Sequence, residues 1–392
     1  MADTSLAWLL QPLSVRTFLD EVWGQTHYHV KRGSEGYFDR LLQGPSVVDE
    51  LLEYVRPEPS GVRLVRRGED KEPASYRLSD GSLDLDRVRG DFADGYTIVL
   101  NRLEEYARTI GSLTHSIEVE LNFPARANGY ITPPGSAGFV PHYDPHDVLV
   151  LQIQGSKVWY LSNDAVVPPH EMHRPDAVVT PELSSPTELH LEAGDVLYVP
   201  RGRVHGAETH SELSVHLTVG IHAPTVLTLM THLLHALSLR DDSIHARLPP
   251  RHLDNAGVRA SLTEVVHDIL RTIEDPSAIE EGLAAMEEVL VRRGRCPLVG
   301  QISNAVGIDA DTVVVKYQPL YSRVLVDSAS VGLQFAQLLI RVSPEHKAAM
   351  QFVSRSAEPF RIRDLPGLTA EQQTALARTL ITTGYLVRLA DM

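Results

Sequence analysis

The chain has 392 residues, of which 43% are hydrophobic and 22% charged, a composition typical of a soluble globular protein with two or three domains. Its formal net charge of −15 argues against broad nucleic-acid binding, which needs a basic surface. The same charge suits a basic protein or peptide as partner. No apolar run approaches the roughly 18–20 residues of a membrane span, so no membrane association is expected.

The N-terminal stretch MADTSLAWLLQPLS lacks the basic start and the small-residue cleavage site of a signal peptide. Cys296 is the only cysteine, which excludes intrachain disulfides and Cys-rich zinc sites. We therefore expect a cytoplasmic protein. Three neighbouring arginines would lower the pKa of this thiol, but an incidental thiol is the simpler interpretation.

The elements in chain order predict a mixed architecture. Residues 12–32 begin with a helix capped near Ser14, and residues 45–95 mix short strands and helices. From Tyr96 to His222, short strands alternate with Gly/Pro turns, as in an all-β sandwich or barrel. Three segments of helical periodicity then follow, at residues 225–239, 261–275 and 277–294.

The C-terminal part has a different pattern. Residues 312–327 predict paired strands, and the last 50 residues predict helix, short strand, helix and strand, with Gly384 ending the second helix. That order suits a winged-helix-like domain. The second helix carries only Arg378 against Glu371, too little for phosphate contacts, so docking is favoured over DNA binding. We expect a mixed N-terminal part (1–95), a β core (96–223), a helical segment (224–305) and this domain (306–392).

Nine of the 18 histidines lie between His142 and His222, a concentration that suggests a site. His142 and Asp144 are two residues apart, so in an extended segment both side chains leave the same face. This spacing is weak evidence alone, because His252 and Asp254 repeat it in a Pro-flanked linker without a matching partner.

The downstream stretch GDVLYVPRGRVH makes the first pair specific. It predicts a tight turn at Gly194, a buried strand, a second turn at residues 200–202, and then His205 on the next strand. The spacing closely matches the second cupin motif. Together with His142 and Asp144, His205 would complete a two-histidine, one-carboxylate triad that suits Fe(II) and leaves positions open for a chelating cosubstrate and dioxygen.

A 2-oxoglutarate cosubstrate would need a cation at its distal carboxylate. The segment DVLVLQIQGSKVWYL predicts a hairpin that turns at residues 154–156, with Lys157 opening the return strand. One lysine in an otherwise apolar pocket is a plausible carboxylate anchor. On the strand at residues 213–220, apolar positions alternate with Ser214, His216 and Thr218, and the polar set would line this pocket if it faces inward.

These segments resemble the cupin-type JmjC oxygenases that include the ribosomal oxygenases. The likeness rests on ANGYITPPGSAGFVPHYDPHDVLVLQIQGSKVWYL, on GDVLYVPRGRVH and on the opening PLSVRTFLDEVWG. It implies an α+β fold: a double-stranded β-helix (cupin or jelly roll) with N-terminal helices, a helical dimerisation segment and a winged-helix-like C-terminal domain. It implies Fe(II) at His142, Asp144 and His205, and 2-oxoglutarate contacts at Lys157, Asn128 and Thr218.

The resemblance also implies hydroxylation of a protein side chain, with a ribosomal protein favoured, and a homodimer. His146 departs from the family pattern and would face the substrate mouth, while Asn128 would otherwise be a simple turn residue. The remaining histidines, at 170, 173, 190 and 210, are expected on solvated loops. Two alternatives stay open: a hydroxylase of a biosynthetic peptide or free amino acid, and a non-catalytic metal-binding cupin. Lysine demethylation is disfavoured, because no aromatic cage can be assigned.

Overall fold

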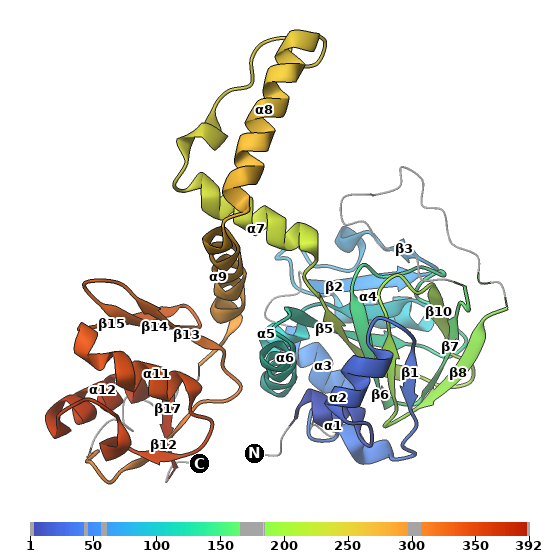
Figure 1. Cartoon of the computed structure of the whole chain (residues 1–392). Helices are drawn as coiled ribbons and strands as arrows, with labels where there is room; N and C mark the ends of the chain where they lie inside the picture. The colour runs from blue at the N-terminus through green and yellow to red at the C-terminus, as the bar shows by residue number, and fades with distance from the viewer. Residues whose placement is uncertain are drawn as a thin grey trace. The chain divides into compact units, whose positions relative to one another are not determined.

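The computed structural model describes residues 4–42, 46–55, 61–164, 183, 185–296 and 307–389. The chain divides into two compact units, Met1–Ala223 and Pro224–Met392 (Figure 1). The boundary expected between residues 305 and 306 falls at the edge of a segment outside the described residues. Among the described residues, no helix is long and apolar enough to cross a membrane.

Two antiparallel sheets form the first unit. The larger contains, from one edge to the other, β1 (Tyr28–Val30), β9 (Val196–Val199), β6 (Asp147–Gln154), β11 (Ser214–Ile221), β5 (Ala125–Thr132), β4 (Thr97–Leu100), β2 (Val62–Arg66) and β3 (Glu69–Asp70). The smaller contains β10 (His205–Glu208), β7 (Ser156–Leu161) and β8 (Thr187–Glu192). The expected double-stranded β-helix is confirmed.

The predicted hairpin over residues 147–161 is wrong in one respect. β6 and β7 do not pair with each other, because β6 pairs with β9 and β11 whereas β7 pairs with β8 and β10. The turn at Gly155 therefore carries the chain from one sheet to the other. The turn after β9 does the same, since β10 belongs to the smaller sheet.

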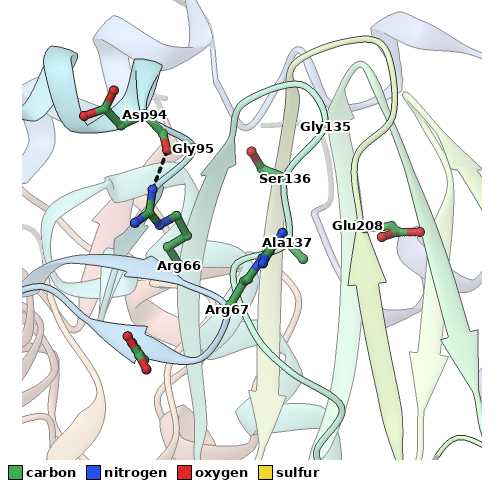
Figure 2. A pocket seen from close by; sticks show the side chains of 9 residues that line it. Arg66, Arg67, Asp94, Gly95, Gly135, Ser136, Ala137 and Glu208 are labelled. Carbon is green, nitrogen blue, oxygen red and sulfur yellow. Dashed lines mark hydrogen bonds between the residues drawn. The ribbon is translucent and has the colours of Figure 1, made fainter.

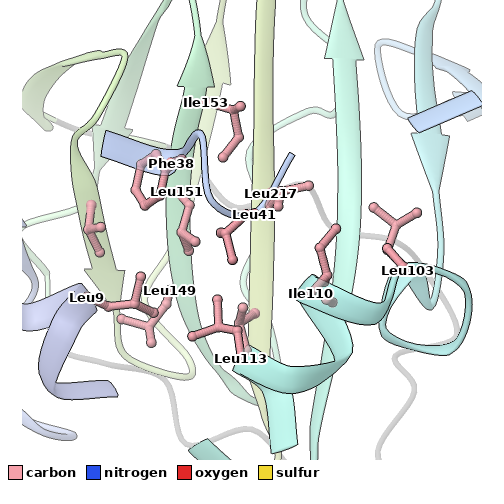
Figure 3. Close-up of a cluster of buried hydrophobic side chains, with 14 of the residues drawn as sticks. Leu9, Phe38, Leu41, Leu103, Ile110, Leu113, Leu149, Leu151, Ile153 and Leu217 are labelled. Atoms are coloured by element: carbon pink, nitrogen blue, oxygen red, sulfur yellow. The ribbon is translucent and has the colours of Figure 1, made fainter. Parts of the chain in front are cut away.

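Helices cover the outer face of the larger sheet (Figure 1). They are α1 (Leu6–Leu10), α2 (Val15–Thr17) with the π-helical turn Phe18–Val22, α3 (Val47–Val55), α4 (Leu85–Ala93), α5 (Leu103–Tyr106) and α6 (Arg108–Leu121). The predicted cap is confirmed: the Ser14 hydroxyl accepts a hydrogen bond from the Thr17 amide. Leu9, Leu113 and Leu149 meet in this outer core (Figure 3).

Strand β6 is buried on both faces, which explains why its sequence reads as a nearly continuous apolar run. Leu149, Leu151 and Ile153 pack against the helices. Val148 and Val150 face the smaller sheet, where they contact an inner cluster formed by Trp159, Leu161, Leu191, Leu197 and Val199. The inner faces of the two sheets therefore enclose the interior in which the predicted site lies.

The second unit begins with α7 (Val226–Ser238), α8 (Ala256–Ile273) and α9 (Pro276–Arg293). Two three-stranded sheets follow: β13 (Ser322–Val326), β14 (Val331–Phe335) and β15 (Leu338–Val342), then β16 (Phe360–Arg361), β12 (Val313–Lys316) and β17 (Leu386–Arg388). Helices α11 (Lys347–Arg355) and α12 (Ala370–Thr382) complete it. The helix–strand–helix–strand order of the last 50 residues is confirmed, and Gly384 follows α12 with a φ of +85°.

The strands predicted within residues 312–327 exist but do not pair with each other. β12 pairs with β16 and β17, whereas β13 pairs with β14. Their segment therefore joins two sheets, because the partner of each strand comes from further along the chain.

Candidate metal centre

His142, Asp144 and His205 converge at one point although the last two are 61 positions apart in the chain. One ligand atom from each of the three lies within 4.8 Å of the others. His142 and His205 form an isolated antiparallel bridge, with amide-to-carbonyl distances of 2.9 and 2.7 Å in the two directions. Asp144 Oδ2 lies 3.6 Å from His205 Nε2.

Both imidazoles are oriented by main-chain carbonyls. His142 Nδ1 lies 2.8 Å from the Val140 carbonyl oxygen, and His205 Nδ1 lies 2.9 Å from that of Arg203. Each carbonyl selects the tautomer with the proton on Nδ1, which leaves Nε2 as a free electron-pair donor. Burial, followed by the neighbouring His142, lowers the pKa of His205 and keeps it neutral, as a metal ligand must be.

Asp147 connects the two segments that carry the His-Asp-His cluster. Its Oδ1 accepts hydrogen bonds from the Tyr198 hydroxyl at 2.6 Å and from the Arg201 amide at 3.3 Å. Beside it, the Gly202 amide donates to the Asp144 carbonyl at 2.9 Å, and Gly202 has the positive φ of +77° that this turn requires. The turn after β9 is therefore fastened to the segment that carries Asp144.

Lys157 is a buried cation in the same interior. Its side chain is 5% exposed, and its Nζ donates to Thr132 Oγ1 at 3.0 Å. Burial lowers the pKa of Lys157 to about 7. No carboxylate in the described part of the chain forms an ion pair with it. An ammonium placed here without a counter-charge is unfavourable unless an anion arrives to meet it.

Asn128 and Thr218 lie directly opposite each other on β5 and β11. The alternative of a turn position for Asn128 is wrong, because Gly129 continues the strand. Asn128 Oδ1 accepts a hydrogen bond from the Arg102 amide at 3.0 Å. Burial, followed by the charge of Asp144, raises the pKa of Tyr130, while Thr218 and Asn128 lower it.

Side chains on the inner face of β5 and β11 form a row from the metal cluster to Lys157. On β5, alternate residues 125, 127 and 131 belong to the outer core, so Asn128, Tyr130 and Thr132 leave the opposite face. The polar face of the strand at residues 213–220 is the inward one, as the prediction required. Tyr130 had no distinguishing signal in the sequence beyond this alternation.

The other histidines are divided between packing and solvent. The His146 ring packs over Gly220, where an added Cβ would lie 3.0 Å from Cε1, and it contacts the His222 ring at 4.5 Å between centroids. His190 is on strand β8 rather than a loop, and His210 is on a loop; both side chains are more than half exposed. His170 and His173 lie outside the described residues.

Cys296 belongs to the second unit, and burial raises its pKa to about 12. The effect of nearby arginines, considered from the sequence, is therefore outweighed by burial, and the thiol is unreactive.

A cavity of about 630 Å³ opens beside the loop that joins β5 to His142 (Figure 2). Arg66, Arg67, Glu69, Asp94 and Glu208 give its lining both charges. It shares no lining residue with the metal cluster. The chemistry is therefore located by the cluster and the barrel interior, rather than by this cavity.

The barrel can be compared with known families on this geometry. A family model described as the JmjC domain matches residues 106–229, which include every predicted ligand and anchor. Residues 106–229 form a JmjC domain.

The relatives of this JmjC domain are oxygenases by name, which confirms the resemblance to the ribosomal oxygenases. The chain is 28% identical over 280 residues to "Ribosomal oxygenase 2" of Mus musculus, covering 68% of this chain and 59% of that protein. It is 31% identical over 228 residues to "Bifunctional lysine-specific demethylase and histidyl-hydroxylase NO66" of Drosophila mojavensis, covering 55% of this chain and 24% of that protein.

Solved structures share the fold of this chain. The X-ray structure of ycfD from Escherichia coli superposes with a TM-score of 0.60 at 19% identity, covering 96% of this chain and 98% of that one. A structure of that protein "in complex with Cobalt and 2-oxoglutarate" has a TM-score of 0.56 at 18% identity, covering 96% and 99% of the two chains. At this identity the likeness shows the architecture alone.

Proposed function

We propose that this chain is an Fe(II)- and 2-oxoglutarate-dependent oxygenase that hydroxylates a side chain of a protein or peptide. One observation carries the proposal: a His-Asp-His cluster and a buried, uncompensated Lys157 occupy the same barrel interior. A metal alone would explain the cluster. The buried cation requires an anion as well, and a dicarboxylate that chelates the metal at one end would supply it.

The residues present fit both groups. Two neutral imidazoles and one carboxylate are the donor set that Fe(II) accepts in non-haem oxygenases, with positions left open. The orphaned buried nitrogens Trp159 Nε1 and His216 Nδ1, which lack hydrogen-bond partners among the described residues, indicate that a polar molecule belongs in the interior. When bound, ferrous iron and 2-oxoglutarate would use dioxygen to transfer one oxygen atom to the substrate, with succinate and carbon dioxide as coproducts.

The protein's own contribution is binding and orientation. His142, Asp144 and His205 would fix the metal, and Lys157 would hold the distal carboxylate through a charge-assisted hydrogen bond. Asn128 and Thr218 would position the cosubstrate between these two ends. The helices over the outer face and the apolar inner cluster around Trp159 would keep water away from the reacting groups.

A basic ribosomal-protein segment is the favoured substrate. The chain's net charge of −15 would attract such a segment, and the relatives above are named ribosomal oxygenase and histidyl-hydroxylase. Because the chain spans 24% and 59% of these two relatives, the substrate is part of the proposal. The NO66 relatives are also named demethylases, so a mass-based assay should register loss of a methylene group as well as gain of an oxygen atom.

The second unit is proposed to form a homodimer through α8. None of the 18 residues of this helix is buried, and Val265, Val266 and Leu270 are 48%, 53% and 45% exposed. An amphipathic helix with an uncovered apolar face needs a partner surface. A second copy of this chain would provide that surface. We further propose that the winged-helix-like tail serves in docking and that the protein is cytoplasmic.

Turnover of 2-oxoglutarate tests the proposed chemistry. The protein is loaded anaerobically with Fe(II), exposed to dioxygen and 2-oxoglutarate, and assayed for succinate. We expect formation that stops in His142→Ala and continues in His190→Ala, a control at an exposed histidine on β8. Equal turnover in His142→Ala would contradict the metal assignment. Absence of 2-oxoglutarate binding to the metal-loaded protein would instead favour the non-catalytic scaffold.

The substrate is sought separately. Lysate from a strain lacking this protein is incubated with the enzyme, and peptides that gain one oxygen atom are identified by mass spectrometry. A ribosomal-protein peptide would support the favoured substrate class, whereas modification confined to small peptides or amino acids would support the biosynthetic alternative.

A further inference from the structure

His216 lies on the inner wall of the barrel, between the metal cluster and Lys157. Its ring stacks on Tyr130, its cross-strand partner, with 4.7 Å between centroids and 2° between planes. Trp159 lies on a further side in an edge-to-face arrangement, with 5.6 Å between centroids and 81° between planes. The side chain is 3% exposed, so these contacts fix the plane of the imidazole.

The strand is also irregular at this residue. Val215 pairs with Gln154 and His216 with Gln152, so one residue of β6 is skipped between them. Such a bulge changes the direction of the neighbouring side chains and is common beside active sites. Gln152 stabilises it by donating to Ser214 Oγ and to the Gln154 carbonyl, both at 2.9 Å.

The imidazole is placed there without a hydrogen-bond partner. Nδ1 of His216 is buried and has none among the described residues. Such an atom costs stability and calls for a ligand or water to satisfy it. Burial, followed by the charge of Lys157, lowers the pKa of His216 well below its usual value, so the ring is neutral and able to donate from one nitrogen.

A carboxylate bound to Lys157 would have room for a further hydrogen-bond donor. Its ammonium has three donors, of which one is used by Thr132. A carboxylate bound there has about four lone-pair sites, more than one lysine fills. His216 pairs with Tyr130, and the next inward-facing pair along the two strands is Ser214 with Thr132, the residue that holds the Lys157 ammonium.

We propose that His216 is a positioning residue for the cosubstrate, whose Nδ1–H donates a second hydrogen bond to the distal carboxylate held by Lys157. This inference rests on the proposed function. It makes the far end of the pocket a two-donor cradle, in which stacking on Tyr130 fixes the direction of the second donor. The cradle would favour a 2-oxo acid with a distal carboxylate over one without.

The test compares two ligands by calorimetry, with redox-inert Mn(II) in place of iron and the whole chain as the protein. The ligands are 2-oxoglutarate and 2-oxopentanoate, which has the same chain length and oxo-acid end but no distal carboxylate. His216→Phe keeps a flat ring on Tyr130 and removes the donor, while His216→Asn restores an N–H donor. His190→Phe is the control for histidine loss at an exposed position.

We expect His216→Phe to bind 2-oxoglutarate roughly 10- to 100-fold more weakly, the loss of a hydrogen bond to a charged group. Its affinity for 2-oxopentanoate should change less than about twofold, and His216→Asn should recover part of the 2-oxoglutarate loss. Equal losses for both ligands would overturn the proposal in favour of a packing role. Unchanged affinities for both would also overturn it, because another group, such as a water molecule, would then satisfy Nδ1. Failure of the unmodified protein to bind 2-oxoglutarate would refute the proposed function itself.

Discussion

Replacing Lys157 with methionine should stabilise the protein while strongly weakening cosubstrate binding. The lysine is 5% exposed and has no ion pair among the described residues. Its pKa falls from 10.5 to about 7 because burial disfavours the charged form. At about 1.4 kcal/mol for each tenfold change in proton affinity, the buried amine costs about 5 kcal/mol near pH 7.

The net gain should be smaller than this cost, because the bond to Thr132 contributes about 1 kcal/mol and methionine packs imperfectly. We expect Lys157→Met to raise the free energy of unfolding by roughly 2–4 kcal/mol, and the melting temperature by about 2–4 °C for each kcal/mol. All three tryptophans, Trp8, Trp23 and Trp159, are in the first unit, so their fluorescence reports its unfolding.

The stability cost of the buried Lys157 amine should depend on pH. The unfolded chain holds the proton up to about pH 10.5, and the folded chain loses it near 7. The cost is therefore fully present below about pH 7 and disappears as the pH rises toward 10.5. The stability difference between Lys157→Met and the unmodified protein should shrink over this interval.

Lys316 offers a matched control in the second unit. It is also buried, donates to the Ser354 carbonyl at 3.0 Å, and has its pKa lowered by burial to about 8. Lys316→Met should leave both the tryptophan transition and 2-oxoglutarate affinity unchanged. A destabilised Lys157→Met, or a gain that does not vary between pH 7 and 10.5, would refute the view of Lys157 as an uncompensated buried cation.

Three further predictions follow from the structure. Binding of 2-oxoglutarate should weaken above about pH 7, because the free Lys157 amine must take up a proton; calorimetry at pH 8 in buffers of different ionisation enthalpy should detect that uptake, and its absence would contradict the anchor. Gly155→Ala should prevent stable folding, since its Cβ would lie 1.9 Å from the Leu213 carbonyl oxygen. The control Gly24→Ala, at a φ of +68° with nothing within 4 Å, should cost about 1–2 kcal/mol in urea unfolding. Similar costs for the two variants would refute the close approach at Gly155. Val266→Asp on α8 should halve the mass measured by light scattering, and the control Glu264→Lys should not; an unchanged mass would place the dimer contact elsewhere.

The sequence pointed to the three predicted ligands because the strands and turns that bring them together fix their spacing in the chain. A turn, a strand and a second turn separate Gly194 from His205, and each leaves a recognisable residue type. Lys157 was recognisable as the lone cation beside an apolar strand. The sequence did not show which sheet each strand joins, since β6 and β7 are adjacent in sequence but pair with strands further away.

Properties that depend on burial could not be predicted from the sequence either. Gly129 left a turn open as the alternative for Asn128, yet glycine is used there because Leu103 would lie 2.8 Å from an added Cβ. Cys296 was interpreted as an incidental thiol despite the arginines near it, and the pKa raised by burial agrees with that interpretation. The role of Asp147 depends on Tyr198, which is 51 residues away and has no motif linking it to Asp147.

The central claim is that one ferrous ion and one 2-oxoglutarate share this barrel, and a single anaerobic titration tests it. Fe(II) is added first and 2-oxoglutarate second, while the visible charge-transfer absorption of a 2-oxo acid chelated to ferrous iron is followed. We predict a band that saturates at one equivalent of each and is absent in His205→Ala. In Lys157→Met the band should appear only at millimolar concentrations of 2-oxoglutarate. A band of unchanged strength in His205→Ala, or none in the unmodified protein, would contradict the account.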